Sequence, residues 1–364
     1  MGQKPERRRD VRWPAMWLLR AASGPLMLMV AVLAACATGV PRPRTNACDV
    51  AAVDDARPVS VDDVALFLHV RGAPCHEPAI LWLHGGPGGA ERPLFRLHAG
   101  DLEHDRLVAY WDQRGAGRSW DPAAPADALT IDRHLADLDR IIDALRARHG
   151  IAKVALVGHS WGAALGVLYA RSHPEKLAGV VAVNPLISGL DSQLAQHRFV
   201  SRMVERTGDR GAARRLAQIG PPPLDAAGSL RLQTLVDRFG GYFHRRPSFL
   251  GTFVLGTLRG YFVPWEVGAF LRANETSLAA MNAELLDLDL TRRVARLEVP
   301  MALFIGRHDR QTDPSLALRF IDALEASERR VIWFEHSAHN IPFEEPEAFM
   351  HALRGILDDP RWTD

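Results

Sequence analysis

The sequence lacks the patterns by which proteins usually bind metal ions and nucleotides. Its histidines and carboxylates do not show the spacing of metal ligands, as in H-E-x-x-H. Neither a P-loop nor a dinucleotide-binding glycine motif occurs. We therefore expect neither a metal ion nor a cofactor, and any chemistry must come from the side chains and backbone of the chain itself.

Near the N-terminus the chain lacks an apolar run of the length that a typical membrane span requires. The run over residues 26–35 is too short, and basic residues precede it at Lys4, Arg7, Arg8, Arg9, Arg12 and Arg20. Leu33-Ala34-Ala35-Cys36 then resembles a bacterial lipobox, in which the cysteine is acylated and becomes the new N-terminus. This pattern predicts a lipoprotein signal peptide over residues 1–35, lipidation at Cys36, and a lipid anchor to a membrane of the bacterial cell envelope, facing the periplasm. The plainer alternative is a secretory signal with an incidental cysteine.

The chain contains few cysteines, and its positive and negative charges nearly balance. Removal of residues 1–35 takes away six basic and two acidic residues, so the formal net charge changes from +1 to −3, which argues against a nucleic-acid partner. Only Cys48 and Cys75 follow Cys36. In an oxidising envelope these two could form a disulfide that ties the N-terminal segment to the first hairpin, or they could remain free thiols. The sequence leaves both possibilities open.

What the chain does contain is a serine at a sharp strand-to-helix turn. Gly158-His159-Ser160-Trp161-Gly162 follows the apolar β-type run 154–157 and precedes a small-residue helical pattern over 163–168. In such a nucleophile elbow the glycines avoid collisions, and the turn lifts Ser160 Oγ clear of the sheet. The backbone N–H of Trp161, at the start of the helix, then points toward a developing oxyanion.

A nucleophilic serine needs a base and an orienting acid, which in this arrangement follow in the order Ser, Asp/Glu, His. The apolar run 301–305 ends in Gly306-Arg307-His308-Asp309, and the run 331–334 leads into a loop that contains His339. We take Asp309 as the acid and His339 as the base. The alternatives are Asp313 as the acid and His336 as the base, or ordinary solvated loop residues throughout.

Three motifs in combination resemble the prolyl iminopeptidase group of α/β-hydrolases. They are His84-Gly85-Gly86-Pro87-Gly88, Asp112-Gln113-Arg114-Gly115-Ala116-Gly117-Arg118-Ser119 and the segment around Ser160. The resemblance covers about residues 60–185 and 296–355. It implies an α/β-hydrolase fold, with a mostly parallel central sheet flanked by helices. It also implies a triad of Ser160, Asp309 and His339, with an oxyanion hole made by the N–H groups of Gly86 and Trp161.

The second of these motifs has a structural interpretation. Gly115 and Gly117 permit a tight turn, and Asp112 with Arg114 or Arg118 can satisfy buried groups near the floor of the site. We therefore do not read this loop as a phosphate or metal site.

Composition changes between residues 186 and 296, where β-type runs give way to helical patterns and to breakers such as Pro221-Pro222-Pro223. We predict a tether over 36–57, a first core part over 58–185, an inserted helical cap over 186–296 and a second core part over 297–364. In the family that the chain resembles, cap carboxylates hold the free α-amine of a peptide. The candidates are Glu266 and Glu275, with Trp265, Phe262 and Tyr261 as pocket walls; solvated acids and core aromatics are the plain alternative.

The resemblance implies a serine aminopeptidase that releases N-terminal residues from short peptides through an acyl-enzyme. A carboxylesterase or another small-molecule hydrolase with the same triad is the alternative, and the cap alone separates the two. A non-catalytic, membrane-tethered binding lipoprotein is less favoured, because a binding module has no need of a triad and an oxyanion loop. A dehalogenase or epoxide hydrolase with an aspartate nucleophile is disfavoured, because the elbow carries Ser160.

Overall fold

The computed structural model describes residues 48, 50–62, 64–245, 249–261 and 266–362. The predicted signal peptide and Cys36 lie outside these residues. Within them, no helix combines the length and the apolar character that crossing a membrane requires.

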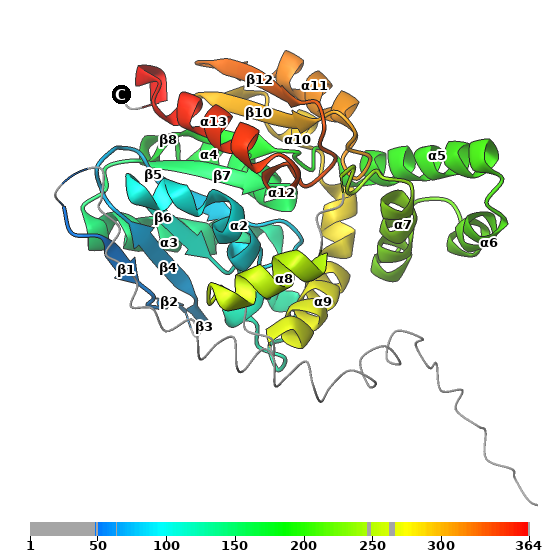
Figure 1. Cartoon of the computed structure of the whole chain (residues 1–364), viewed down its shortest axis with the longest axis horizontal. Helices are drawn as coiled ribbons and strands as arrows, with labels where there is room; N and C mark the ends of the chain where they lie inside the picture. Colours follow the sequence, from blue (N-terminus) through cyan, green and yellow to red (C-terminus); the bar gives the residue numbers. More distant parts are fainter. Residues whose placement is uncertain (1–47, 49, 63, 246–248, 262–265, 363–364) are drawn as a thin grey trace, which may run out of the picture. The chain divides into compact units, whose positions relative to one another are not determined.

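A sheet of eight strands forms the centre of the described part of the chain (Figure 1). Strand β4 pairs antiparallel with β1 and β6, and the remaining pairs are parallel. In spatial order the strands are β1 (Val53–Asp55), β4 (Leu68–Gly72), β6 (Leu107–Trp111), β5 (Ala79–Leu83), β7 (Val154–His159), β8 (Leu177–Val183), β10 (Met301–Gly306) and β12 (Arg329–Phe334). Two smaller sheets pair β2 (Val59–Val61) with β3 (Val64–Leu66), and β9 (Arg296–Leu297) with β11 (Glu325–Ala326).

Helices cover both faces of the central sheet, which explains why its inner parallel strands are buried without alternation. Side chains of successive strand residues point to opposite faces, so Leu81 and Leu83 pack on one face while Ile80 and Trp82 pack on the other. The first face is covered by α3 (Ile131–His149), α4 (Trp161–Ser172) and α11 (Pro314–Ala323), and the second by α2 (Arg92–Ala99), α12 (Ile341–Glu344) and α13 (Pro346–Leu357). Short 3-10 helices are η2 (Gly100–His104), η3 (Gly117–Ser119), η4 (Ala126–Ala128), η5 (Pro174–Lys176) and η6 (Pro360–Trp362).

The stretch between β8 and β9 contains helices in its described residues, together with one isolated bridge between Ser188 and Asp289. The helices are α5 (Gly189–Thr207), α6 (Arg210–Ile219), α7 (Ala226–Arg238), α8 (Phe249–Leu258), α9 (Glu266–Asp287) and α10 (Leu290–Arg293). Side chains of Ser188, Asp209, Asp225 and Asp289 accept hydrogen bonds at helix N-termini, which explains why the chain turns at these points. Three of the helices share a small core of their own, built around Val200, Leu232 and Val236. We refer to residues 186–296 as the cap.

The N-terminal edge of the sheet differs from the expectation. Residues 53–55 fall within the predicted tether but form β1, which pairs with β4. Besides the strand ladder, the carboxylate of Asp54 bonds the His69 ring at 2.7 Å, so a short, charged segment is held at the sheet edge. Cys48 and Cys75 form a disulfide. The sequence left that pairing open.

Candidate active site

Ser160 lies at the turn between β7 and α4, in a backbone conformation that L-residues rarely adopt, with φ +54° and ψ −114°. Its N–H donates to the Val183 carbonyl at 2.9 Å, which ties the turn to the neighbouring strand. A Cβ on Gly158 would lie 2.5 Å from the carbonyl oxygen of Gly162, and a Cβ on Gly162 would lie 2.2 Å from that of Leu83. Both glycines are therefore required for the strained turn that presents Ser160.

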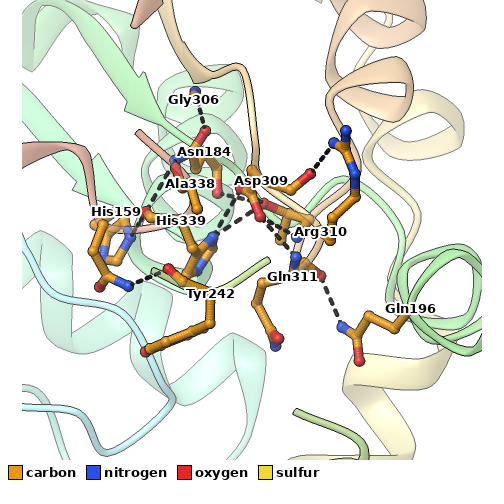
Figure 2. Close-up of polar contacts among 12 residues, drawn as sticks. His159, Asn184, Gln196, Tyr242, Gly306, Asp309, Arg310, Gln311, Ala338 and His339 are labelled. Carbon is orange, nitrogen blue, oxygen red and sulfur yellow. Dashed lines mark hydrogen bonds and ion pairs between the residues drawn. The ribbon is translucent and has the colours of Figure 1, made fainter. Parts of the chain in front are cut away.

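Asp309 and His339 lie in direct contact beyond the ends of β10 and β12. His339 Nδ1 is 2.9 Å from Asp309 Oδ2, and the carboxylate is fully buried (Figure 2). Asp309 Oδ1 accepts from the N–H groups of Gln311 and Thr312, at 2.7 and 3.0 Å, and Oδ2 accepts from the Thr312 hydroxyl at 2.7 Å. These donors stabilise the Asp309 carboxylate, which would otherwise be costly to bury, and they orient it so that Oδ2 faces the His339 imidazole.

The alternative acid and base lie elsewhere. The Asp313 carboxylate accepts from the Ser315 N–H at 2.8 Å and caps α11. His336 is exposed, and its backbone N–H donates to Glu345 at 3.0 Å. Neither residue lines the cavity that contains Ser160 and His339.

The loop that carries His339 is held through its backbone. The His339 carbonyl accepts from Asn184 Nδ2 and lies 2.9 Å from His159 Nε2, and its N–H donates to the Tyr242 carbonyl at 3.1 Å (Figure 2). Asn184 Oδ1 also accepts from the Gly306 N–H at 2.9 Å, so this one amide joins the ends of β8, β10 and the His339 loop. Sequence reasoning missed Asn184; its position directly after a buried strand was the available signal.

The glycine loop after β5 lies beside Ser160. Gly86 has φ +122°, and a Cβ there would lie 2.6 Å from the Gly88 nitrogen, so only glycine fits. Gly85, Gly86 and Gly89 line the same cavity as Ser160 and His339. Trp161 is the first residue of α4, and its N–H therefore belongs to the unpaired donors of that helix end.

The loop after β6 joins these two parts of the site. Gln113 Nε2 donates to the His84 carbonyl at 2.9 Å, while Gln113 Oε1 accepts from the Trp161 indole at 3.0 Å. Asp112 accepts from the Arg118 N–H at 2.9 Å, but Arg114 pairs with the buried carboxylate of Asp137 rather than with Asp112. The contacts of this loop are thus with the protein itself. Among the residues described, no group of three or more histidines, cysteines and carboxylates could hold a metal ion.

A second contact between a carboxylate and a histidine lies beside the first. His159 Nδ1 is 2.8 Å from Glu91 Oε1, and the two rings of His159 and His339 have centroids 4.8 Å apart. Burial alone would lower the pKa of His159, but the Glu91 carboxylate raises that pKa above its ordinary value. Burial alone would raise the pKa of Glu91, but the His159 ring holds it below its ordinary value. Each group therefore favours the charged form of the other.

Core and cap residues together line a cavity of about 370 Å³. The cap contributes uncharged polar groups, at Ser192, Gln193, Gln196, Ser229, Gln233, Asn274 and Asn282, and apolar groups that include Leu230, Phe270, Leu278 and Leu285. On α9 the lining residues recur every three or four positions, which is the spacing of one helix face. Glu91 is the one carboxylate among the described lining residues.

The expected amine-binding carboxylates are not among those lining residues. Glu275 is exposed on α9 and does not line the cavity. Glu266 begins α9, but its side chain, like Trp265 and Phe262, lies outside the residues described. Tyr261 is half-buried against the Arg96 guanidinium, 4.4 Å from the ring centroid, and does not line the cavity.

Comparisons with known proteins agree with this architecture. Residues 78–216 match a family model described as alpha/beta hydrolase fold. A probable aminopeptidase, YbaC, from Bacillus subtilis is 27% identical over 302 residues, which cover 81% of this chain and 93% of that protein. A proline iminopeptidase from Saccharolobus solfataricus is 27% identical over 292 residues, covering 77% of this chain and 84% of that protein.

Among solved structures, a proline iminopeptidase from Mycobacterium smegmatis superposes with a TM-score of 0.64 at 20% identity, covering 85% of this chain and 99% of that one. A likeness at this identity shows the fold alone. The predicted fold class is confirmed: the chain has the α/β-hydrolase fold, and its relatives by sequence support a hydrolase.

Proposed function

We propose that this chain is a serine aminopeptidase of prolyl iminopeptidase type, which releases N-terminal residues from short peptides. The observation that carries the proposal is the placement of Ser160, on a strained elbow, in one cavity with a histidine whose Nδ1 bonds a buried carboxylate. The names of the sequence relatives, an aminopeptidase and a proline iminopeptidase, favour a peptide substrate over other acyl compounds.

In this proposal His339 Nε2 takes the proton of Ser160 Oγ while Oγ attacks the carbonyl carbon of the first peptide bond. The N–H groups of Gly86 and Trp161 donate to the resulting oxyanion. The intermediate collapses when His339 returns the proton to the leaving amine, which leaves an acyl-enzyme. Water, deprotonated by His339, then releases the N-terminal residue and restores Ser160. Asp309 keeps the imidazole in the tautomer that these steps need.

A carboxylesterase is the second candidate, and the cap favours it in one respect. The cap residues that line the cavity, within the part that is described, carry amides, hydroxyls and apolar groups but no carboxylate for a substrate amine. An ester of a neutral acid needs no such group. The α-amine of a peptide needs one, and the Glu266 side chain is the remaining cap candidate.

A substrate panel separates these functions. We expect cleavage of prolyl or other aminoacyl arylamides with a free amine, and at least a tenfold lower rate when the amine is acylated. Equal rates for free and blocked substrates, or activity on short-chain aryl esters alone, would favour the esterase. A folded protein that hydrolyses none of these compounds and resists a fluorophosphonate probe would instead indicate a binding lipoprotein.

We also propose that the chain is a lipoprotein of the bacterial cell envelope, anchored through Cys36. The lipobox and the preceding basic segment support this location, since both are typical of lipoprotein signals. Cys36→Ser should abolish labelling by a fatty-acid analogue and prevent signal processing. Wild-type protein that is recovered soluble and unlabelled from the periplasm would contradict the anchor.

A further inference from the structure

His159 makes contacts through both of its ring nitrogens, and both contacts are to oxygen atoms that accept. Nδ1 lies 2.8 Å from Glu91 Oε1, and Nε2 lies 2.9 Å from the His339 carbonyl oxygen. A carboxylate and a carbonyl offer lone pairs and no proton. A neutral imidazole carries only one N–H, so one of its nitrogens would face an oxygen lone pair with a lone pair of its own. Only the imidazolium, with two N–H groups, satisfies both contacts.

The surroundings of His159 agree with a charged ring. Its side chain is 2% exposed and that of Glu91 is 13% exposed, so water contributes little to the solvation of either group. A buried imidazolium requires a compensating charge, and Glu91 supplies it at hydrogen-bond distance. The other ionisable groups that face this pair are His84, Tyr242, His339 and Asp309, and Asp309 adds a second negative charge.

Besides His159, the Glu91 carboxylate interacts with the backbone of Gly85 in the glycine loop. Glu91 precedes α2, but its side chain makes no capping hydrogen bond to that helix. A Cβ on Gly85 would lie 3.0 Å from Glu91 Oε1, 3.2 Å from His159 Nδ1 and 3.4 Å from Ser160 Cβ. The glycine loop thus lets the carboxylate, the imidazole and the nucleophile meet at one point in the cavity wall.

We propose that Glu91 holds His159 as an imidazolium, and that this pair positions His339 through the His339 carbonyl oxygen. His159 directly precedes Ser160 in the sequence. Its side chain therefore fixes the position of the His339 loop relative to the turn that carries Ser160. The inference rests on the proposed roles of Ser160 and His339, but not on the class of substrate. It also implies that the charge of Glu91 is already paired and does not serve as the anchor of a substrate amine.

Loss of the second proton on His159 should release this arrangement. The Nε2 lone pair would then face the His339 carbonyl, and the loop would lose one of its two side-chain donors, leaving Asn184 alone. Turnover should therefore decline at alkaline pH.

The protonation state can be measured without any activity. In wild-type protein with labelled histidines, the nitrogen resonances of His159 should show an imidazolium at neutral pH. In Glu91→Gln they should show a neutral ring at the same pH. A neutral His159 in folded wild-type protein would overturn the proposal, and this arm is independent of whether any variant folds or any substrate is cleaved.

The kinetic arm uses an aryl ester, which any hydrolase with this triad should cleave. Glu91→Gln should lower kcat about 10- to 100-fold at neutral pH with little change in KM, and should move the alkaline decline to lower pH. Asp54→Asn is the matched control, because Asp54 contacts the ring of His69 at 2.7 Å at the sheet edge; its profile should equal that of wild type.

A loss in Glu91→Gln that is the same at every pH, or no loss, would overturn the positioning role. Persistent activity in Ser160→Ala would refute the proposed function instead, and would leave the resonance result standing.

Discussion

The two walls of the cavity are built differently. On the core wall and directly behind it, charged side chains have buried partners: Glu91 lines the cavity and bonds His159, and Asp309, which bonds the lining residue His339, receives three further donors. On the cap wall, the described side chains are neutral and bond to neutral partners, such as Gln193 to the Ser229 hydroxyl at 2.7 Å and Gln196 to the Gln311 carbonyl at 2.7 Å.

This contrast indicates that the core wall carries out the chemistry, whereas the cap wall selects the substrate. Groups that must hold a proton or a charge at a fixed place lie on loops at one edge of a rigid sheet, where burial strengthens their interactions. Groups on the cap offer neutral hydrogen bonds and apolar surface, which shape a cavity without fixing a reaction. Changes to the core wall should therefore affect every substrate, whereas changes to the cap wall should affect some substrates more than others.

The largest effect is expected on the core wall at Ser160. Ser160→Ala should reduce hydrolysis of every substrate by about 10⁵-fold or more, because Oγ is the proposed nucleophile. The fold should remain, since alanine suits the turn at least as well as serine. Labelling by a fluorophosphonate probe should disappear together with turnover. Residual activity above about a hundredth of wild type would show that another residue attacks the substrate.

Asp309→Asn should have the next largest effect, with kcat lower by about 10⁴-fold, because an amide would favour the wrong imidazole tautomer. Asp313→Asn is the matched control, since Asp313 caps α11 and does not contact His339. It should cost less than tenfold in kcat. If the two variants exchanged these effects, the acid would have to be reassigned to Asp313.

The same contrast explains what the sequence could predict. Parallel strands that are buried on both faces appear as uninterrupted apolar runs, so β5, β7 and β10 were predictable. Strand β12 lies at the sheet edge and is only partly buried, but its apolar run over residues 331–334 also marked it. Ser160, Asp309 and His339 each follow such a run, and the carboxyl ends of parallel strands lie at one edge of the sheet. The order of the motifs along the chain was therefore enough to anticipate that these three would gather.

Other parts could not be predicted because they depend on pairings between distant segments. Glu91 and His159 are 68 positions apart, and no local pattern relates a residue before α2 to the elbow. Strand β1 is only three residues long and carries two aspartates, so it lacked the apolar run that marks a strand. On the cap, periodicity can show which residues share one face of α9, but not which neighbour covers that face.

A variant on the cap wall tests the expectation that this wall selects substrates without taking part in the chemistry. Gln233→Leu replaces one neutral polar group of the cap wall with an apolar one of similar size. We expect KM to change by less than about tenfold, and to change differently for substrates with polar and apolar leaving groups, because one hydrogen bond is worth about 1 kcal/mol. kcat for a small aryl ester should stay within about twofold. A uniform loss of kcat across the panel would mean that the cap wall takes part in the chemistry.

The smallest expected effect is on the free energy of unfolding rather than on the rate. Only variants of the core wall should show a cost in stability that depends on pH. Because the Glu91 carboxylate raises the pKa of His159 above its ordinary value of 6.5, the stabilisation from this histidine is full below pH 6.5 and is lost as pH rises through the raised value. The pKa of Glu91 lies below its ordinary value of 4.5, so its stabilisation is present above pH 4.5 and is lost as pH falls through the lowered value. Both contributions are therefore present together between pH 4.5 and 6.5.

Glu91→Gln should lower the free energy of unfolding by about 2 kcal/mol in that window, as for loss of a hydrogen bond to a charged group, and by less at about pH 9. On the cap, Gln193→Ala removes neutral hydrogen bonds to Ser229 and to the Leu224 N–H, so its cost should be the same at both pH values. Denaturant unfolding of the two variants at each pH measures both differences, and a cost for Glu91→Gln that does not change with pH would show that the pair is not ionic.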